Sequence, residues 1–313
     1  MAFSTDVRRE LARVPCDRQC CALSEINGMV LASGGLSFRG QGRYGLEIRT
    51  KHNGIARRYY TMMRRWLNAG SDIRIAKTRQ LGEHNRYILS PAAEDIPGML
   101  SALDLLDEKQ PFGMRSVPDR AFLRRECCQT AFLRGAFLAG GSLNNPERAY
   151  HMEIAVSDEG LAACLCELLN RRGIPAKTAL RKSQYIAYVK SAESIADFLT
   201  LLGANRARLD FEAIRMNKEL RNEINRQMNC DTSNLDKAIF ASERQRSMIE
   251  AIDKSIGLDA LEPALREIAE LRLRYPAASL AELGSMTTPS ISKSGVSARM
   301  RKIQALAEEL VNE

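Results

Sequence analysis

The sequence has few of the residues on which metal sites and nucleophilic catalysis usually depend. It contains three histidines in 313 residues, and its eight cysteines include no Cys-x-x-Cys pair. Structural zinc sites commonly use such pairs, so the spacing predicts no metal site and free cysteines that pack as small apolar side chains. There is also no Ser-His-Asp set and no glycine-rich phosphate loop. The sequence therefore predicts no cofactor.

Long hydrophobic runs are also absent. No segment approaches the roughly 18 apolar residues of a membrane-spanning helix, and the first residues lack the apolar core of a signal peptide. These absences predict a cytoplasmic protein with no membrane partner. The length of 313 residues favours about two domains.

One stretch of sequence occurs twice. Residues 20–36 return as residues 127–143, an offset of 107 without a gap, and seven of the seventeen positions are identical. Each copy is long enough for a helix of three or four turns and ends in a cluster of glycine and serine. Small residues four apart form a bare stripe on each helix, which predicts paired central helices in a duplicated domain. The stripes consist of Gly28 and Ala32 in the first copy and of Gly135 and Ala139 in the second.

Both copies predict the order α-β-β-α-β-β-α. For the first copy, at about residues 1–113, we expect helices at 3–14, 55–68 and 96–106 and strands at 36–39, 45–49, 73–77 and 86–89, before a linker marked by Pro111, Gly113 and Pro118. For the second copy, at about 114–203, we expect strands at 150–156, 176–180 and 185–189 and helices at 160–171 and 194–202. Two strand pairs per copy predict an antiparallel four-stranded sheet with helices on one face.

Charge is concentrated in two zones of this basic chain, whose net charge is +8. Residues 39–88 hold twelve Lys or Arg against three acids, and residues 285–303 hold four without any acid. Alternation along residues 45–49 turns Glu47 and Arg49 outward, so the outer face of the first sheet should be basic. Two basic zones favour a nucleic-acid partner, with a merely solvated surface as the alternative.

The C-terminal part is predicted to be helical throughout. Residues 204–233 suit a basic linker helix, and residues 234–313 an all-α domain. Residues 279–282 form a capping box that opens a short helix ending at Gly284, and a longer helix follows from about residue 292. A short helix, a turn and a longer helix with a basic start are typical of the helix-turn-helix, with an ordinary helical hairpin as the alternative.

In that arrangement the second helix enters the major groove. Lys293, Ser297, Arg301 and Gln304 are predicted to share its exposed face, with Arg299 and Lys302 at the edges near phosphates. The full set expected to contact DNA is Ser279, Ser292, Lys293, Ser294, Ser297, Arg299, Arg301, Lys302 and Gln304.

Several motifs carry a resemblance to a known family. The central helices, above all residues 133–142, resemble the LAGLIDADG helices of homing endonucleases. The opening residues 1–11, residues 225–237 and residues 291–303 resemble the WhiA family, in which a degenerate LAGLIDADG pair precedes a C-terminal helix-turn-helix. The resemblance spans nearly the whole chain. It implies an α+β fold with a duplicated LAGLIDADG-like domain at 1–203, followed by the linker helix and a helix-turn-helix domain at 234–313.

A LAGLIDADG nuclease needs an acid near the end of each central helix to hold divalent metal against the scissile phosphates. Those positions are Ser33 and Gly140 here, and neither supplies a carboxylate, so no catalytic residue is predicted. Glu47 and Glu153 recur at nearly equivalent places, which leaves a relocated metal site as an alternative.

The WhiA resemblance implies a non-enzymatic, nucleoid-associated transcriptional regulator of cell division, chromosome segregation or sporulation. Its partner would be double-stranded promoter DNA, and the duplicated domain leaves room for a protein partner. One alternative is a metal-dependent LAGLIDADG-type endonuclease, against which the missing acids argue. The other is a protein-binding adaptor. It stays open because residues 144–190 are only weakly basic, with seven Lys or Arg against five acids.

Overall fold

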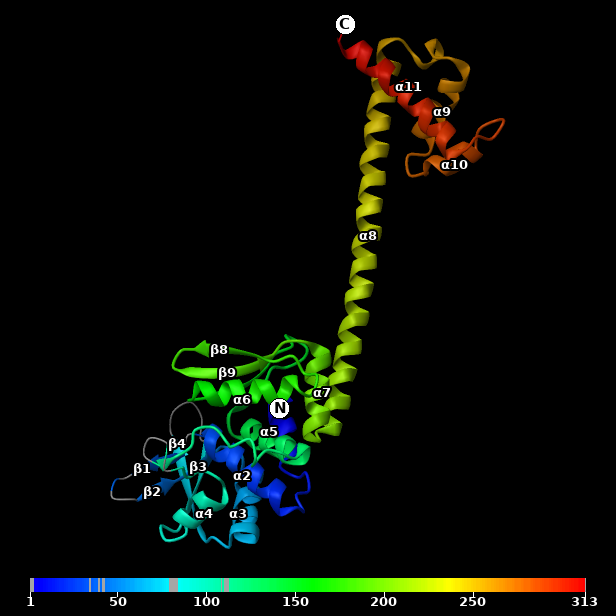
Figure 1. Cartoon of the computed structure of the whole chain (residues 1–313). Coiled ribbons are helices and arrows are strands. Elements are labelled where there is room, and N and C mark those ends of the chain that lie inside the picture. Colours follow the sequence, from blue (N-terminus) through cyan, green and yellow to red (C-terminus); the bar gives the residue numbers. More distant parts are fainter. Residues whose placement is uncertain are drawn as a thin grey trace. The chain divides into compact units, whose positions relative to one another are not determined.

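Two helices, α2 (Gln19–Ser33) and α5 (Glu126–Gly140), lie side by side at the centre of the N-terminal part of the chain (Figure 1). The computed structural model describes residues 3–33, 35–38, 40, 43–78, 84–107, 109 and 113–312. A Cβ atom at Gly28 would lie 2.3 Å from the carbonyl oxygen of Phe132, and one at Gly135 would lie 2.0 Å from that of Glu25. The predicted contact through these two glycines is confirmed. Ala32 and Ala139, from the same stripes, are half-buried.

The second copy forms one antiparallel four-stranded sheet in the order β6-β7-β9-β8. Helix α6 packs against β7, β8 and β9, and α7 packs against α5. Strand β6 continues directly from α5 and was not predicted, because the small residues Gly141 and Ser142 suggested only a helix end. The elements are β6 (Gly141–Leu143), β7 (Met152–Val156), α6 (Glu159–Asn170), β8 (Lys177–Arg181), β9 (Gln184–Val189) and α7 (Ala192–Leu202).

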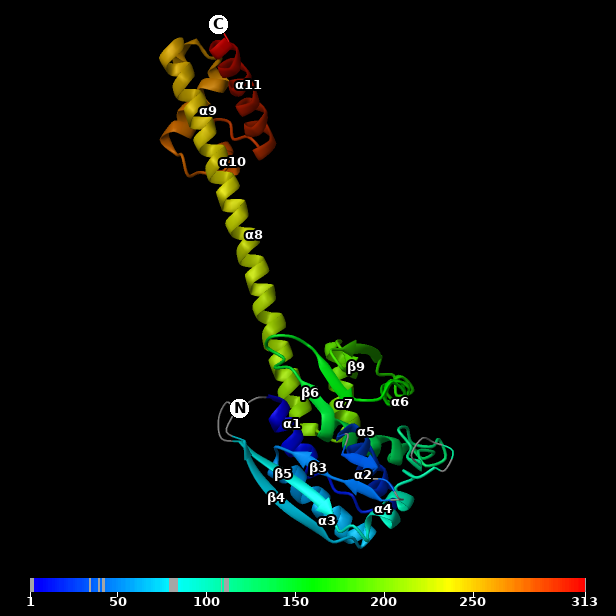
Figure 2. The same cartoon turned by 90° about the vertical axis from the view of Figure 1, so that its left-hand side faces the viewer.

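The first copy differs from the four-stranded sheet that was predicted. Its strands form a two-stranded pair, β1-β2, and a three-stranded sheet, β3-β5-β4. Helix α3 packs against the three-stranded sheet (Figure 2). The predicted strand 45–49 is divided at Glu47, where the chain changes its pairing from β1 to β5. The elements are α1 (Phe3–Leu11), β1 (Leu36–Phe38), β2 (Tyr44–Leu46), β3 (Ile48–Thr50), α3 (Asn53–Leu67), β4 (Ser71–Thr78), β5 (His84–Pro91) and α4 (Ile96–Ala102).

The predicted alternation of inward and outward side chains is nevertheless kept on either side of Glu47, because Leu46 and Ile48 are both buried. Gly34, Arg39 and Pro111, which belong to a predicted helix end, strand and linker, lie outside the described residues.

A group of buried charges joins the two copies. The carboxylate of Glu25 has no exposed surface, and it accepts hydrogen bonds from Arg58 at 2.5 and 2.8 Å and from Arg134 at 3.2 Å. Arg134 also donates to the carbonyl oxygen of Leu202 at 2.9 Å, and Arg58 donates to that of Val14. A buried carboxylate is stable only when its oxygens are paired and hydrogen-bonded, and here two guanidinium groups meet that need.

The predicted linker helix and the helix expected after residue 234 are one helix, α8 (Asn205–Ser255). The reason is that residues 205–255 contain neither glycine nor proline, so nothing interrupts the backbone hydrogen bonding. Contacts divide the chain into two compact units, Met1–Glu219 and Leu220–Glu313. The first turns of α8 belong to the first unit, where Phe211 packs against Phe3 and Tyr150.

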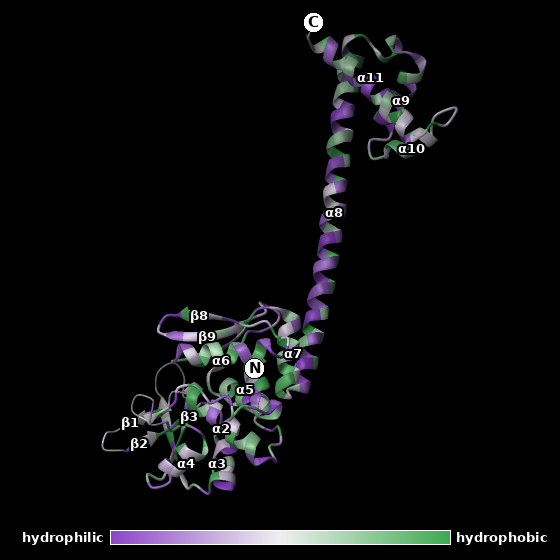
Figure 3. Cartoon of the chain, viewed as in Figure 1, coloured by the Kyte–Doolittle hydropathy of each residue, from purple (hydrophilic) through white to green (hydrophobic). Residues whose placement is uncertain are grey.

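Farther along, α8 carries mainly hydrophilic residues (Figure 3). Among the described residues, no helix combines the length and apolar character needed to span a membrane.

Candidate nucleic-acid interface

One short 3-10 helix and three α-helices complete the second unit around the end of α8. They are η2 (Leu258–Ala260), α9 (Pro263–Arg274), α10 (Leu280–Ser285) and α11 (Lys293–Asn312). The predicted order of short helix, turn and longer helix is confirmed. The buried apolar side chains that hold these elements together are Ile249, Ile252, Leu261, Leu265, Ile268, Ala269, Leu283, Val296, Met300, Ile303 and Ala307.

The capping box predicted for the short helix is present. The hydroxyl of Ser279 accepts from the backbone N–H of Glu282 at 3.3 Å, and the Glu282 carboxylate accepts from the Ser279 N–H at 2.7 Å. The backbone hydrogen bond from Ser279 lowers the pKa of Glu282. Helix α10 ends at Ser285, one residue beyond the predicted end at Gly284.

The turn between α10 and α11 is fixed by hydrogen bonds. The Thr287 side chain is buried, and its hydroxyl lies 2.9 Å from the carbonyl oxygen of Gly284. The Glu267 carboxylate of α9 accepts from the backbone N–H of Thr288 at 2.9 Å. Helix α11 then begins at Lys293, with the Ser292 hydroxyl accepting from the N–H of Gly295 at 3.3 Å. The first turns of α11 are therefore held rigidly against the rest of the unit.

Only part of the predicted DNA-contacting set forms the open face of α11. Lys293, Ser294, Arg301 and Lys302 are exposed, and no acid precedes Glu308 in this helix. Such a surface offers two forms of contact, since guanidinium groups pair with guanine edges and ammonium groups with phosphates.

Of the other predicted residues, three face neighbouring elements of the unit, while Ser279 and Ser292 are exposed but make local hydrogen bonds. Ser297 and Gln304 are half-buried and line a cavity of about 360 Å³ between α11 and α8, with Arg301 at its rim. Arg299 turns towards α9, where it donates to the carbonyl oxygen of Ala264 at 3.3 Å and lies 3.7 Å from the Glu267 carboxylate. Ser279 caps α10, and Ser292 bonds to Ser294 at 2.8 Å. The exposed face of α11 is thus narrower than its sequence indicated.

A second basic surface lies in the first unit, at the C-terminal end of α5. Arg8, Arg49, Lys51 and Arg86 line a cavity of about 460 Å³ beside Leu138 and Ala139. We call these four residues the basic pocket. A neighbouring cavity of about 820 Å³ shares Arg8, Lys51 and His52 and adds further arginines from α1 and α3.

Two further observations describe the electrostatics of the first sheet and of the basic pocket beside it. Arg49 and Arg74 lie on either side of Ile88 in the sheet register, so the predicted basic outer face of the first sheet is confirmed. Burial lowers the pKa of His52, and the positive charges of Arg8, Arg9 and Lys51 lower it further. Arg8 and Lys51, whose charges lower this pKa, belong to the basic pocket, and its four cations suit it to an anion such as phosphate. Arg8 belongs to the basic pocket because α1 packs on α5. The sequence did not indicate this packing.

Neither of the two nuclease positions supplies a carboxylate. The Ser33 hydroxyl donates to the carbonyl oxygen of Val30 at 3.1 Å, and Gly140 has no side chain. The other acid of the nuclease motif is replaced by Leu31 and Leu138, both of which are buried.

The glutamates proposed for a relocated metal site are instead paired with basic side chains. Glu47 lies 2.6 Å from Arg49 and 3.9 Å from Arg74. Glu153 lies 2.9 Å from His151 and 3.0 Å from Arg181. Burial acts to raise the pKa of Glu153, but the His151 hydrogen bond and the Arg181 charge lower it overall. Ion pairs account for both glutamates without a metal.

Three family models match consecutive parts of the chain. The WhiA N-terminal LAGLIDADG-like domain matches residues 19–106, the WhiA LAGLIDADG-like domain residues 129–221, and the WhiA C-terminal HTH domain residues 224–307. The chain belongs to the WhiA family. The resemblance inferred from its motifs is confirmed, as is the α+β fold with a duplicated LAGLIDADG-like domain followed by a helix-turn-helix domain.

WhiA relatives match over nearly their whole length. A "Probable cell division protein WhiA" of Desulfitobacterium hafniense (strain Y51) is 42% identical over 310 residues, covering 99% of this chain and 96% of that protein. Its counterpart in Oceanobacillus iheyensis is 39% identical over 312 residues, covering 99% and 98%. The crystal structure of full-length DUF199/WhiA from Thermatoga maritima superposes with a TM-score of 0.60 at 25% identity and covers 99% of both chains.

Proposed function

We propose that the chain is a DNA-binding transcriptional regulator of cell division, in which α11 contacts base edges of a promoter in the major groove. The observation that carries this proposal is the exposed, acid-free face of α11 formed by Lys293, Ser294, Arg301 and Lys302. Support comes from the HTH family match and from relatives named as probable cell division proteins. A role in chromosome segregation or sporulation fits the same activity, exerted at the nucleoid.

In this proposal the duplicated domain is a non-catalytic DNA-contacting surface. The basic pocket lies at the end of α5, where a LAGLIDADG nuclease would place metal and scissile phosphates. Arginine and lysine side chains at that place favour phosphate binding without cleavage. The ion-paired glutamates and the missing acids support the absence of nuclease activity.

The proposal is tested by comparing Arg301→Ala with Lys302→Ala in the full chain, on one footprinted promoter site and one scrambled site at several salt concentrations. Arg301→Ala should cost the promoter site about 1–3 kcal/mol and leave the scrambled site much less affected. Lys302→Ala should weaken both sites alike and reduce the salt slope by about one.

Lys254→Ala, in the last turn of α8, removes the same charge from outside α11 and serves as the control. Unchanged site preference after Arg301→Ala would move sequence recognition away from α11. Incubating supercoiled DNA with the protein and magnesium or manganese tests the nuclease alternative. Nicking that disappears in Glu47→Gln or Glu153→Gln would support it, and intact DNA is expected.

A further inference from the structure

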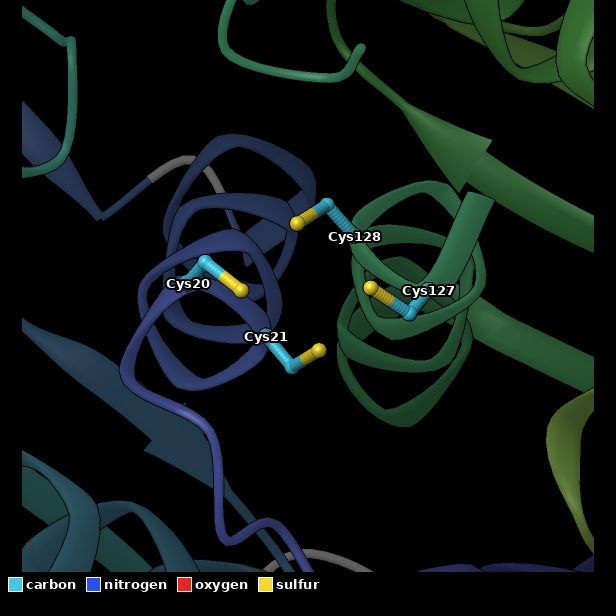
Figure 4. A group of neighbouring side chains, drawn as sticks. All are labelled: Cys20, Cys21, Cys127 and Cys128. Atoms are coloured by element: carbon cyan, nitrogen blue, oxygen red, sulfur yellow. The ribbon is translucent and has the colours of Figure 1, made fainter. Parts of the chain in front are cut away.

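Four cysteine side chains converge where the two central helices begin. Cys20 and Cys21 lie in the first turn of α2, and Cys127 and Cys128 lie in the first turn of α5. Figure 4 shows the four sulfur atoms gathered between the two helices. All of the Sγ atoms lie within 4.8 Å of one another. Among the described residues, this is the one group of metal-binding side chains that comes together so closely.

The duplication explains this convergence. The Cys-Cys dipeptide occurs at equivalent positions of the two copies, 107 residues apart, and the close approach at Gly28 and Gly135 brings the helix starts together. Each helix therefore contributes two thiols to one place. Neither dipeptide has the Cys-x-x-Cys spacing from which a metal site was judged. That spacing test applies within one segment and cannot detect four ligands shared between the two copies.

We propose that these four cysteines bind one zinc ion as a closed tetrathiolate site. Tetrahedral zinc holds thiolate sulfurs at about 2.3 Å, which places the sulfurs roughly 3.8 Å apart. Starting from separations within 4.8 Å, side-chain movements of about 1 Å or less reach that geometry. Four protein ligands leave no open position for a substrate, so the site is structural.

The surroundings favour negative charge on sulfur. The first turns of α2 and α5 present backbone N–H groups and the positive ends of two helix dipoles. Arg125 adds a guanidinium whose Nη1 lies 3.9 Å from the Sγ atom of Cys20. Burial acts to raise the pKa of Cys20, but hydrogen bonds with Cys128, Cys21 and Arg125 lower it overall.

Two of the other thiols, Cys21 and Cys128, favour their protonated form in the absence of a metal. Burial raises the pKa of Cys128 to about 11 and raises that of Cys21 as well. Zinc binding replaces the thiol protons by Zn–S bonds, and those protons leave to solvent. The two helix starts would then be joined by a metal, about 20 Å along α2 from Ser33, where a nuclease would hold its own.

The test uses the full chain, purified under reducing conditions from cells supplied with zinc. Elemental analysis and native mass spectrometry should find one zinc per chain. In the double variant Cys21→Ser/Cys127→Ser, zinc content should fall at least tenfold. The matched variant Cys16→Ser/Cys164→Ser changes two half-buried cysteines outside the cluster and should retain zinc.

A titration of the unaltered protein keeps the proposal testable if the variant does not fold. A mercurial reagent should release the zinc as four thiols react, and cobalt substitution should produce a thiolate-to-metal charge-transfer band. Three results would overturn the proposal: protein without metal after zinc supply, iron in place of zinc, or a metal-free chain lighter by four hydrogens because of two disulfides between the helices.

Discussion

A Cβ atom at Gly140 would lie 2.3 Å from the carbonyl oxygen of Ala155, so strand β7 closes directly over the end of α5. In a LAGLIDADG nuclease this position carries an acid. Here the backbone of β7 occupies the space that the carboxylate would need. An aspartate or glutamate therefore cannot be placed at position 140 unless β7 moves.

We accordingly expect that Gly140→Asp does not create a nuclease and destabilises the first unit. Overpacking against backbone atoms costs about 1–3 kcal/mol. Urea unfolding measures this cost, with Gly98→Asp as the control, because nothing lies within 4 Å of a Cβ atom at Gly98 in α4. Equal stability of the two variants would show that β7 can move away from position 140.

The contact between the central helices should tolerate no added methyl group. In Gly135→Ala the new Cβ atom meets the Glu25 carbonyl at 2.0 Å, so the helices must separate, at a cost of about 1–3 kcal/mol. Gly98→Ala makes the same change in open space and should be neutral or stabilising by up to about 1 kcal/mol. Thermal melts of both variants give the comparison, and an unchanged melting temperature for Gly135→Ala would place the contact elsewhere.

The basic pocket should contribute affinity without sequence preference. Lys51→Ala removes one exposed cation and should reduce the slope of log affinity against log salt by about one, equally for promoter and scrambled DNA. Lys177→Ala, on the exposed strand β8, is the control of equal charge. If Lys51→Ala binds like the parent, Lys51 makes no phosphate contact and the adaptor hypothesis gains support.

The Glu153 ion pair predicts a specific dependence on pH. Its folded-state pKa is lowered from 4.5, so its contribution to stability is complete above that pH and disappears as the pH falls through the folded-state pKa. The parent protein should therefore be more stable than Glu153→Gln at pH 6, and the difference should shrink below about pH 4. Unfolding free energies from pH 3 to 7 measure it, with the exposed Glu193→Gln as the control. A difference that grows towards low pH would contradict the ion-pair interpretation.

The sequence was most informative where the pattern was local. The four-residue spacing of Gly28 and Ala32, repeated in the second copy, predicted small-residue stripes, and Ser279 with Glu282 predicted the capping box, because each of these patterns lies within one helix. The division of the strand at Glu47 escaped prediction, since it depends on which strand each half pairs with. Alternation alone cannot distinguish one continuous strand from two.

The exposed face of α11 also could not be predicted fully from the sequence of that helix alone. Helical spacing placed Ser297 and Gln304 beside Arg301, but both line the cavity between α11 and α8, so their exposure depends on α8. Arg299 was placed near phosphates, yet a carbonyl and a carboxylate of α9 hold it. These outcomes depend on tertiary neighbours that a single helix does not specify.

The buried pair Glu25 and Arg134 has a consequence for the ancestry of the duplicated domain. With the offset of 107, Glu25 corresponds to Phe132 and Arg134 corresponds to Asn27, so the two copies carry different charges at equivalent places. A symmetric dimer of the second copy would bury two arginines without an acid, and one of the first copy would leave Glu25 with Arg58 alone. An unpaired buried charge costs about 3–5 kcal/mol. A homodimer of the second copy is therefore strongly disfavoured, and the second copy depends on the first for the acid that pairs with Arg134.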